Sequence, residues 1–338
     1  MRERVEQAMK ATVEEGGAAV CVIVDGEPVV DAWAGDWERD TIVNVYSTTK
    51  TMAAATALLL ADRGELDVTA PVARYWPEFA AAGKQDVTMA QVLSHSSGLS
   101  GWREPLATAD LYDWEKATGL LAAQEPWWKP GTASGYHAAT QGYLIGEVVR
   151  RITGRTLGTV FREEIAEPLG ADFHIGLPAA EDHRVAALIP PATPISGFEQ
   201  SEIQVNAATN PPIPVSETQT RAWRGAEIPA ANGHGNARSI ATALTALTTG
   251  TVISEAGARR ALEVQVEGTD LVLGFPIRWG LGFAVGGFSP ETLAWGGNGG
   301  SLAIADLGAH STFAYVTSRM GSEIVDTRAL GVAMAMRE

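Results

Sequence analysis

Strand-like segments stand at both ends of this chain of 338 residues, and helix-like segments fill its middle. Near the start, two apolar runs flank Asp25-Gly26, a pair that favours a tight hairpin turn. The expected strands cover residues 18–24, 28–35, 271–275, 279–285, 301–306 and 312–318. This order predicts a discontinuous α/β domain of residues 1–66 and 232–338, with an inserted, mainly helical domain over residues 67–231.

Helical periodicity and stop signals define the remaining elements. The expected helices cover residues 2–15, 87–93, 111–123, 139–153, 157–164 and 238–249, a run from just after Ser47 to Arg63-Gly64, and a terminal run after Gly321. Residues 176–231 are rich in Pro, Thr and Ala and show little periodicity. That stretch is long for a loop in a compact domain, so we expect it to form a lid or a wall of a site.

Charge and cysteine content exclude several classes of protein. The chain has 25 basic and 40 acidic residues, a net charge of -15, which is the wrong sign for binding nucleic acid or an anionic membrane surface. Its one cysteine, Cys21, lies in an apolar run and is expected to fill the core, so no disulfide framework forms. With no secretory leader and no apolar run of membrane-spanning length, we expect a cytoplasmic protein; the oligomeric state is left open.

The first candidate for chemistry is Ser47-Thr48-Thr49-Lys50. A serine at the start of a helix and a lysine three residues on share one face, which suits a nucleophile and its base. Lysine can accept a proton near neutral pH only if burial lowers its pKa from about 10.4. The alternative is a helix start with an exposed lysine, and spacing alone favours that alternative.

Two further segments supply context. Tyr136, in Gly135-Tyr136-His137-Ala138, stands at the mouth of the helix expected over 139–153, where an aromatic residue taken alone indicates packing. The run Trp295-Gly296-Gly297-Asn298-Gly299-Gly300-Ser301 precedes an expected strand. Such glycines permit close approach of the backbone to a ligand and can present N–H groups to an anion, or they form a bulge or hairpin. The histidines show no metal-ligand spacing, and no Gly-x-Ser-x-Gly elbow is present.

Taken in this order, and together with His95-Ser96-Ser97-Gly98-Leu99 and residues 142–154, these segments resemble the serine β-lactamase and penicillin-binding-protein superfamily. The likeness is to the class C β-lactamase-like branch that includes the family VIII carboxylesterases, over about residues 15–335. The resemblance implies the β-lactamase-like (DD-peptidase) fold, an α/β (α+β) fold with an antiparallel sheet flanked by helices and an inserted helical domain. It implies no cofactor and no metal.

The resemblance also assigns roles to individual residues. Ser47 would be the acylated nucleophile, Lys50 its proton acceptor and Tyr136 the phenol of a proton relay. The backbone N–H groups of Ser47 and Asn298 would form the oxyanion hole. The substrate-binding positions would be Trp295, Gly296, Gly297, His137 and Ala138. The alternative for His137 is an exposed histidine at the start of a helix.

Two departures from the family pattern shift the expected substrate. Trp295-Gly296-Gly297 stands in place of Lys-Thr-Gly, and no lysine follows Lys129, so the cation that reads a substrate carboxylate is absent. Ala138 replaces the asparagine of Tyr-x-Asn. Both changes point from β-lactams and D-Ala peptides toward small carboxylic esters. With one lysine missing, we expect a neutral Lys50 or a concerted Lys50–Tyr136 pair as the base.

The sequence therefore predicts a serine acyl-enzyme hydrolase acting on a small-molecule ester. One alternative is a biosynthetic transacylase that moves an acyl group from an ester donor to an amine or alcohol held by residues 176–231. The other is a catalytically weak β-lactam-binding homologue. Arg224 and Arg238 are the candidates for a replacement cation, and His234 is expected either to line the cleft or to form a structural turn.

Overall fold

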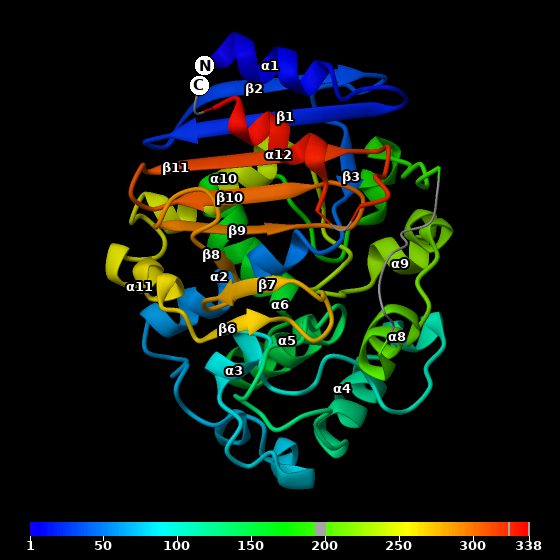
Figure 1. Cartoon of the computed structure of the whole chain (residues 1–338), viewed down its shortest axis with the longest axis vertical. Helices are drawn as coiled ribbons and strands as arrows, with labels where there is room; N and C mark the ends of the chain where they lie inside the picture. Colours follow the sequence, from blue (N-terminus) through cyan, green and yellow to red (C-terminus); the bar gives the residue numbers. More distant parts are fainter. Residues whose placement is uncertain (193–200, 324, 337–338) are drawn as a thin grey trace.

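The computed structural model describes residues 1–192, 201–323 and 325–336. Its central element is an eight-stranded sheet in the order β2-β1-β11-β10-β9-β8-β7-β6 (Figure 1). Every neighbouring pair in this sheet is antiparallel. The strands are β1 (Gly17–Val24), β2 (Glu27–Gly35), β6 (Val266–Thr269), β7 (Pro276–Trp279), β8 (Ala284–Val285), β9 (Thr292–Gly296), β10 (Leu302–Asp306) and β11 (Ser311–Thr317).

The two ends of the chain meet where β1 pairs with β11, with Val20 opposite Tyr315. The predicted hairpin between β1 and β2 is confirmed. Asp25 and Gly26 have φ angles of 50° and 81°, the left-handed values that a two-residue hairpin turn requires at both central positions. The Asp25-Gly26 pair thus correctly predicts the turn that joins β1 to β2.

Helices cover both faces of the sheet (Figure 1). On the outer face, α1 (Arg2–Lys10) and α12 (Thr327–Met334) place Val5 and Val332 against Phe313 and Tyr315. On the inner face, α10 (Ala237–Thr248) packs against β1, β10 and β11, and α2 (Thr49–Asp62) packs against α10. Cys21 is fully buried on that inner face, where burial raises the pKa of its thiol to about 12.

The middle of the chain is helical. It contains α3 (Met89–Leu93), α4 (Trp114–Ala123), α5 (Thr140–Thr153), α6 (Leu157–Phe161), α7 (Glu167–Leu169), α8 (Glu202–Thr209) and α9 (Arg221–Gly225), and α11 (Glu255–Arg259) follows α10. A small second sheet joins β3 (Ile42–Asn44) to β4 (Val185–Ala186) and β5 (His234–Gly235). That sheet links segments on both sides of the proposed domain boundaries, which stay a prediction.

Several expected elements are wrong in detail. Residues 271–275 form a turn and not a strand, because the carboxylate of Asp270 accepts the N–H groups of Val272 and Leu273, and Gly274 adopts a φ of 77°. The strand expected over 279–285 is broken at Gly282, where a φ of 89° turns the chain close to α2.

Helix ends also differ from their expected positions. The first helix stops at Lys10, and α6 passes at Phe161 into a π-helical turn over 162–166. The stretch over 176–231 contains short helices, including α8 and α9, whose first turns are capped by Ser201 and Thr220. Residues 193–200, part of the expected lid, lie outside the described residues.

The longest helices in the described ranges, α2 and α5, have 14 residues each. Neither these helices nor any other described helix has the length and apolar character needed to cross a bilayer.

Helix α2 is the central helix of the molecule, because 13 of its 14 residues are buried. We predict that Leu59→Ala, a truncation at a fully buried position of α2, lowers the free energy of unfolding by about 2–5 kcal/mol. Chemical denaturation followed by circular dichroism measures the change. Val205→Ala on the exposed side of α8 is the control, and it should change stability by less than about 0.5 kcal/mol. Equal effects of the two variants would contradict this assignment of the core.

Candidate active site

Ser47 lies in a sharp turn between β3 and α2. Tyr46, just before it, has a φ of 43°, a left-handed value that a non-glycine residue adopts only when its surroundings enforce it. The enforcing contacts are the hydrogen bonds from Val45 N to Gly233 O and from Thr48 N to Val45 O. The turn exposes the Ser47 side chain to a cavity while Tyr46 stays in the core.

The Lys50 amine lies directly beneath Ser47. Its Nζ is 3.1 Å from Ser47 Oγ, 2.6 Å from the carbonyl oxygen of Ala138 and 2.9 Å from that of Ala230. Lys50 is fully buried, and burial lowers its pKa well below the usual 10.5. A neutral amine has two N–H bonds and one lone pair. Because the two carbonyls can only accept, they take the N–H bonds, and the lone pair is left for the Ser47 hydroxyl.

Tyr136 stands on the other side of Ser47. Burial raises the pKa of its phenol above the usual 10, while the neighbouring Ser47 and Trp295 act in the opposite direction and are outweighed. Trp295 Nε1 donates to the phenol oxygen over 3.0 Å, and the Lys50 amine lies 4.8 Å from the centre of the ring. The tyrosine is therefore a neutral phenol that can donate a proton.

Sequence reasoning missed the group that holds Tyr136. The carboxylate of the fully buried Asp270 accepts the backbone N–H of Tyr136 over 2.9 Å and Trp279 Nε1 over 3.2 Å. Trp279 in turn stacks on Tyr136, with ring planes 6° apart and centroids separated by 6.1 Å. The only signal in the sequence is an aspartate before an apolar run, which marks a turn and says nothing of the distant tyrosine.

The residue before Asn298, one of the two candidate oxyanion donors, comes close to the turn that holds the other, Ser47. A Cβ at Gly297 would be 2.1 Å from the carbonyl oxygen of Val45 and 3.2 Å from Ser47 N, so only glycine permits the segment after β9 to approach the turn that holds Ser47 this closely. Within the described residues, neither the amide of Ser47 nor that of Asn298 donates a hydrogen bond to the protein. Both residues line the cavity, and the role of their amides as oxyanion donors stays a prediction.

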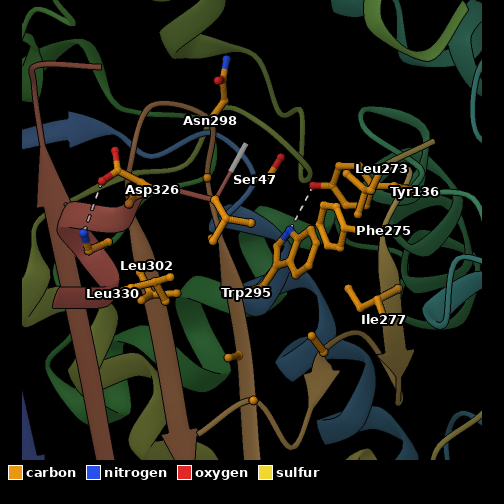
Figure 2. A pocket seen from close by; sticks show the side chains of 18 of the residues that line it. Ser47, Tyr136, Leu273, Phe275, Ile277, Trp295, Asn298, Leu302, Asp326 and Leu330 are labelled. Carbon is orange, nitrogen blue, oxygen red and sulfur yellow. Dashed lines mark hydrogen bonds between the residues drawn. The ribbon is translucent and has the colours of Figure 1, made fainter. Parts of the chain in front are cut away.

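The cavity has a volume of about 440 Å³ and mostly apolar walls. Figure 2 shows Ser47 between two sides of it. The side next to Tyr136 is formed by Leu273, Phe275 and Ile277, and the opposite side by Leu302 and Leu330. No lysine or arginine is among the described lining residues. The lining carboxylate of Asp326 is paired with Arg328 at 2.5 Å.

Only some of the predicted substrate-binding residues line the cavity. Trp295, Gly296 and Gly297 line the cavity. His137 does not, and neither a substrate contact nor an exposed position fits it. It is fully buried, bonded to Ser97 Oγ at 2.7 Å, and burial lowers its pKa to about 4. Ala138 contributes its carbonyl to Lys50 and not a side chain to the cavity.

The other candidates lie away from the cavity. Arg238 pairs with Asp31 and Asp40, and Arg224 lies 3.5 Å from Asp182. His234 is buried in β5, and burial lowers its pKa to about 3. The described parts of the 176–231 segment do not line the cavity, although Ala230 supplies a carbonyl to Lys50.

Comparisons with known proteins identify a family for the chain. The family described as Beta-lactamase matches residues 3–335. The protein "Esterase/beta-lactamase LipL" of Mycobacterium tuberculosis (strain ATCC 25618 / H37Rv) is 35% identical over 353 residues, which cover 92% of this chain and 79% of the relative.

Solved structures extend the likeness to the fold. A crystal structure of a family VIII carboxylesterase is 42% identical with a TM-score of 0.92, covering 98% of this chain and 96% of that one. A penicillin-binding protein homologue from Caulobacter crescentus is 37% identical with a TM-score of 0.93, covering 99% and 96%. The fold predicted from the sequence is confirmed.

The buried amine predicts a definite pH dependence for the reactivity of Ser47. Only neutral Lys50 can accept a proton, so the rate at which a fluorophosphonate labels Ser47 should rise with pH through the lowered pKa of Lys50. Because burial raises the pKa of Tyr136, the rate should then stay on a plateau beyond about pH 9. Stopped-time labelling followed by mass spectrometry gives the profile.

Two variants distinguish the contributions of Lys50 and Tyr136 to that pH profile. Tyr136→Phe should keep the rising limb, and Lys50→Met should lose it together with most of the rate. A rising limb that survives in Lys50→Met would show that Lys50 is not the base.

Proposed function

The chain belongs to the Beta-lactamase family, and from that premise we propose that it is a serine hydrolase that cleaves small carboxylic esters through an acyl-enzyme at Ser47. The observation that carries the proposal is the position of Lys50, whose amine has two carbonyl acceptors and keeps its lone pair for the Ser47 hydroxyl. The names of the LipL relative and of the carboxylesterase structure support an esterase.

In the acylation step, Lys50 accepts the proton of Ser47 as Oγ attacks the carbonyl carbon of the ester. The oxygen of that carbonyl becomes an oxyanion between the amides of Ser47 and Asn298. Two such donors are commonly worth about 3–4 kcal/mol each in the transition state. Both donors belong to backbone that is already fixed, so they need no reorganisation when the charge develops.

The tetrahedral intermediate then expels the alcohol. Its oxygen takes a proton from the Tyr136 phenol, and the proton held by Lys50 restores the phenol. Water then attacks the acyl-Ser47 ester as its proton passes to the phenol oxygen of Tyr136 and the phenol proton passes to Lys50. When the second tetrahedral intermediate collapses, Lys50 returns that proton to Ser47 Oγ. The cycle ends with a carboxylic acid, an alcohol and the starting protonation state.

The cavity favours neutral esters with apolar groups over β-lactams. The family lysine that reads a carboxylate is replaced by Trp295, whose indole N–H is engaged by Tyr136. The guanidinium of Arg328, close to the cavity, is paired with Asp326. A substrate carboxylate would therefore lose its hydration and gain no cation in return.

We predict that Ser47→Ala abolishes hydrolysis of p-nitrophenyl butyrate, with a loss of more than about a thousand-fold, because the nucleophile is removed. The thermal midpoint should not fall, since Ser47 lies at the cavity and not in the core. Ser201→Ala, in an exposed helix cap, is the matched control and should keep full activity. Undiminished hydrolysis by Ser47→Ala would reject the mechanism.

We also predict that benzylpenicillin is turned over at least about a thousand-fold less efficiently than the best ester, since the cavity offers its carboxylate no cation. Hydrolysis of both compounds is measured side by side as kcat/KM. Hydrolysis of a reactive chromogenic cephalosporin alone is compatible with the proposal. Efficient penicillin turnover would mean that a cation does reach the site, and Arg328→Ala would then identify it.

A further inference from the structure

A buried hydroxyl lies between the turn that holds Ser47 and the turn that holds Asn298, which joins β9 to β10. Ser301, directly before β10, is 8% exposed. Its Oγ lies 2.9 Å from the carbonyl oxygen of Val45 and 2.9 Å from Thr48 Oγ1. A carbonyl can only accept, so Ser301 donates its one proton to Val45 and Thr48 must donate to Ser301. The direction of both hydrogen bonds is thus determined.

Val45 and Thr48 are the two ends of the turn that holds Ser47. They are already joined by the hydrogen bond from Thr48 N to Val45 O, at 3.2 Å. The hydroxyl of Ser301 therefore contacts both ends of this turn at once. Moving Ser301 would move the backbone amide of Ser47 with respect to the rest of the site.

The same residue also closes the turn that holds Asn298. The carbonyl oxygen of Ser301 accepts Gly297 N over 2.8 Å, and Gly300 N donates to Gly297 O over 3.1 Å. Asn298 lies inside this closed turn. Ser301 is thus bonded through its side chain to the segment with one candidate oxyanion donor and through its backbone to the segment with the other.

We infer that Ser301 and Thr48 form a positioning clamp that fixes the distance between the amides of Ser47 and Asn298. The inference rests on the proposed function, because the proposed function assigns those amides their role as oxyanion donors. The sheet does not need the clamp: β9 and β10 pair through backbone hydrogen bonds, with Gly296 opposite Leu302. A misplacement of about 1 Å at a reacting centre costs up to about a hundred-fold in rate.

The test removes each hydroxyl without changing its surroundings. Ser301→Ala and Thr48→Val are made singly and together, and kcat and KM are measured with p-nitrophenyl butyrate. We expect kcat to fall by about ten- to a hundred-fold in each single variant, with KM within about two-fold. Because both hydroxyls belong to one clamp, the double variant should lose much less than the product of the two single losses.

A second readout does not depend on turnover. Phenylboronic acid forms a tetrahedral adduct with a serine nucleophile, and one boron oxygen then occupies the oxyanion position. Its dissociation constant should weaken in the variants by a factor similar to the loss in kcat. A role limited to stability would lower the thermal midpoint and leave this affinity unchanged.

Thr56→Val is the matched control. Thr56 is a fully buried threonine of the same helix, α2, and its hydroxyl bonds only to the carbonyl of Met52 at 2.8 Å among the described contacts. It should change the thermal midpoint and leave kcat and boronate affinity within about two-fold. If Ser301→Ala does not fold, Thr48→Val carries the test by itself.

The outcomes separate the clamp from the proposed function. Boronate affinity and kcat that stay at wild-type levels in both single variants would overturn the clamp. A wild type that binds boronate but hydrolyses no ester would overturn the proposed function alone, while the boronate series still decides on the clamp.

Discussion

The Lys50 amine lies 3.1 Å from Ser47 Oγ, and its other hydrogen-bond partners are two peptide carbonyls. The proposed chemistry of the site depends on the burial of this amine away from water. Burial of a charged ammonium without a carboxylate is unfavourable, so the neutral form prevails. The carbonyls come from Ala138, before α5, and Ala230, before β5. Three segments distant in sequence must therefore meet before the lysine becomes a base.

Trp295 stands where the family pattern has a lysine, and this change makes the proposed chemistry depend more strongly on Lys50. A cation beside the phenol would favour the phenolate, whereas an indole N–H is a neutral donor. Burial then dominates and raises the pKa of Tyr136. In the proposed mechanism, the phenol therefore passes a proton to the leaving group, and Lys50 remains the base. The substitution that removes the carboxylate-binding cation thus also assigns separate roles to the two groups.

What the sequence could predict was local, and what it missed depends on contacts between distant segments. The hairpin at Asp25-Gly26 and the helix after Ser47 follow from adjacent residues, and the three-residue spacing of Ser47 and Lys50 places them on one face. In contrast, the carbonyl of Ala230 carries no signal, because every residue has one. His137 was expected at the surface or at the substrate, but Ser97, 40 residues away, holds it in the core.

The apolar, cation-free cavity has a consequence for the end of the reaction as well as for its start. Hydrolysis converts a neutral ester into a carboxylate, and the described lining residues offer that product no positive charge. The chain as a whole carries a net charge of -15, so its field also disfavours an anion. A neutral ester enters such a cavity at little cost, while the ionised acid is more stable in water. In the proposed function, the lack of a cation that disfavours β-lactam carboxylates therefore also promotes release of the acid, and it keeps the product from competing with the next ester.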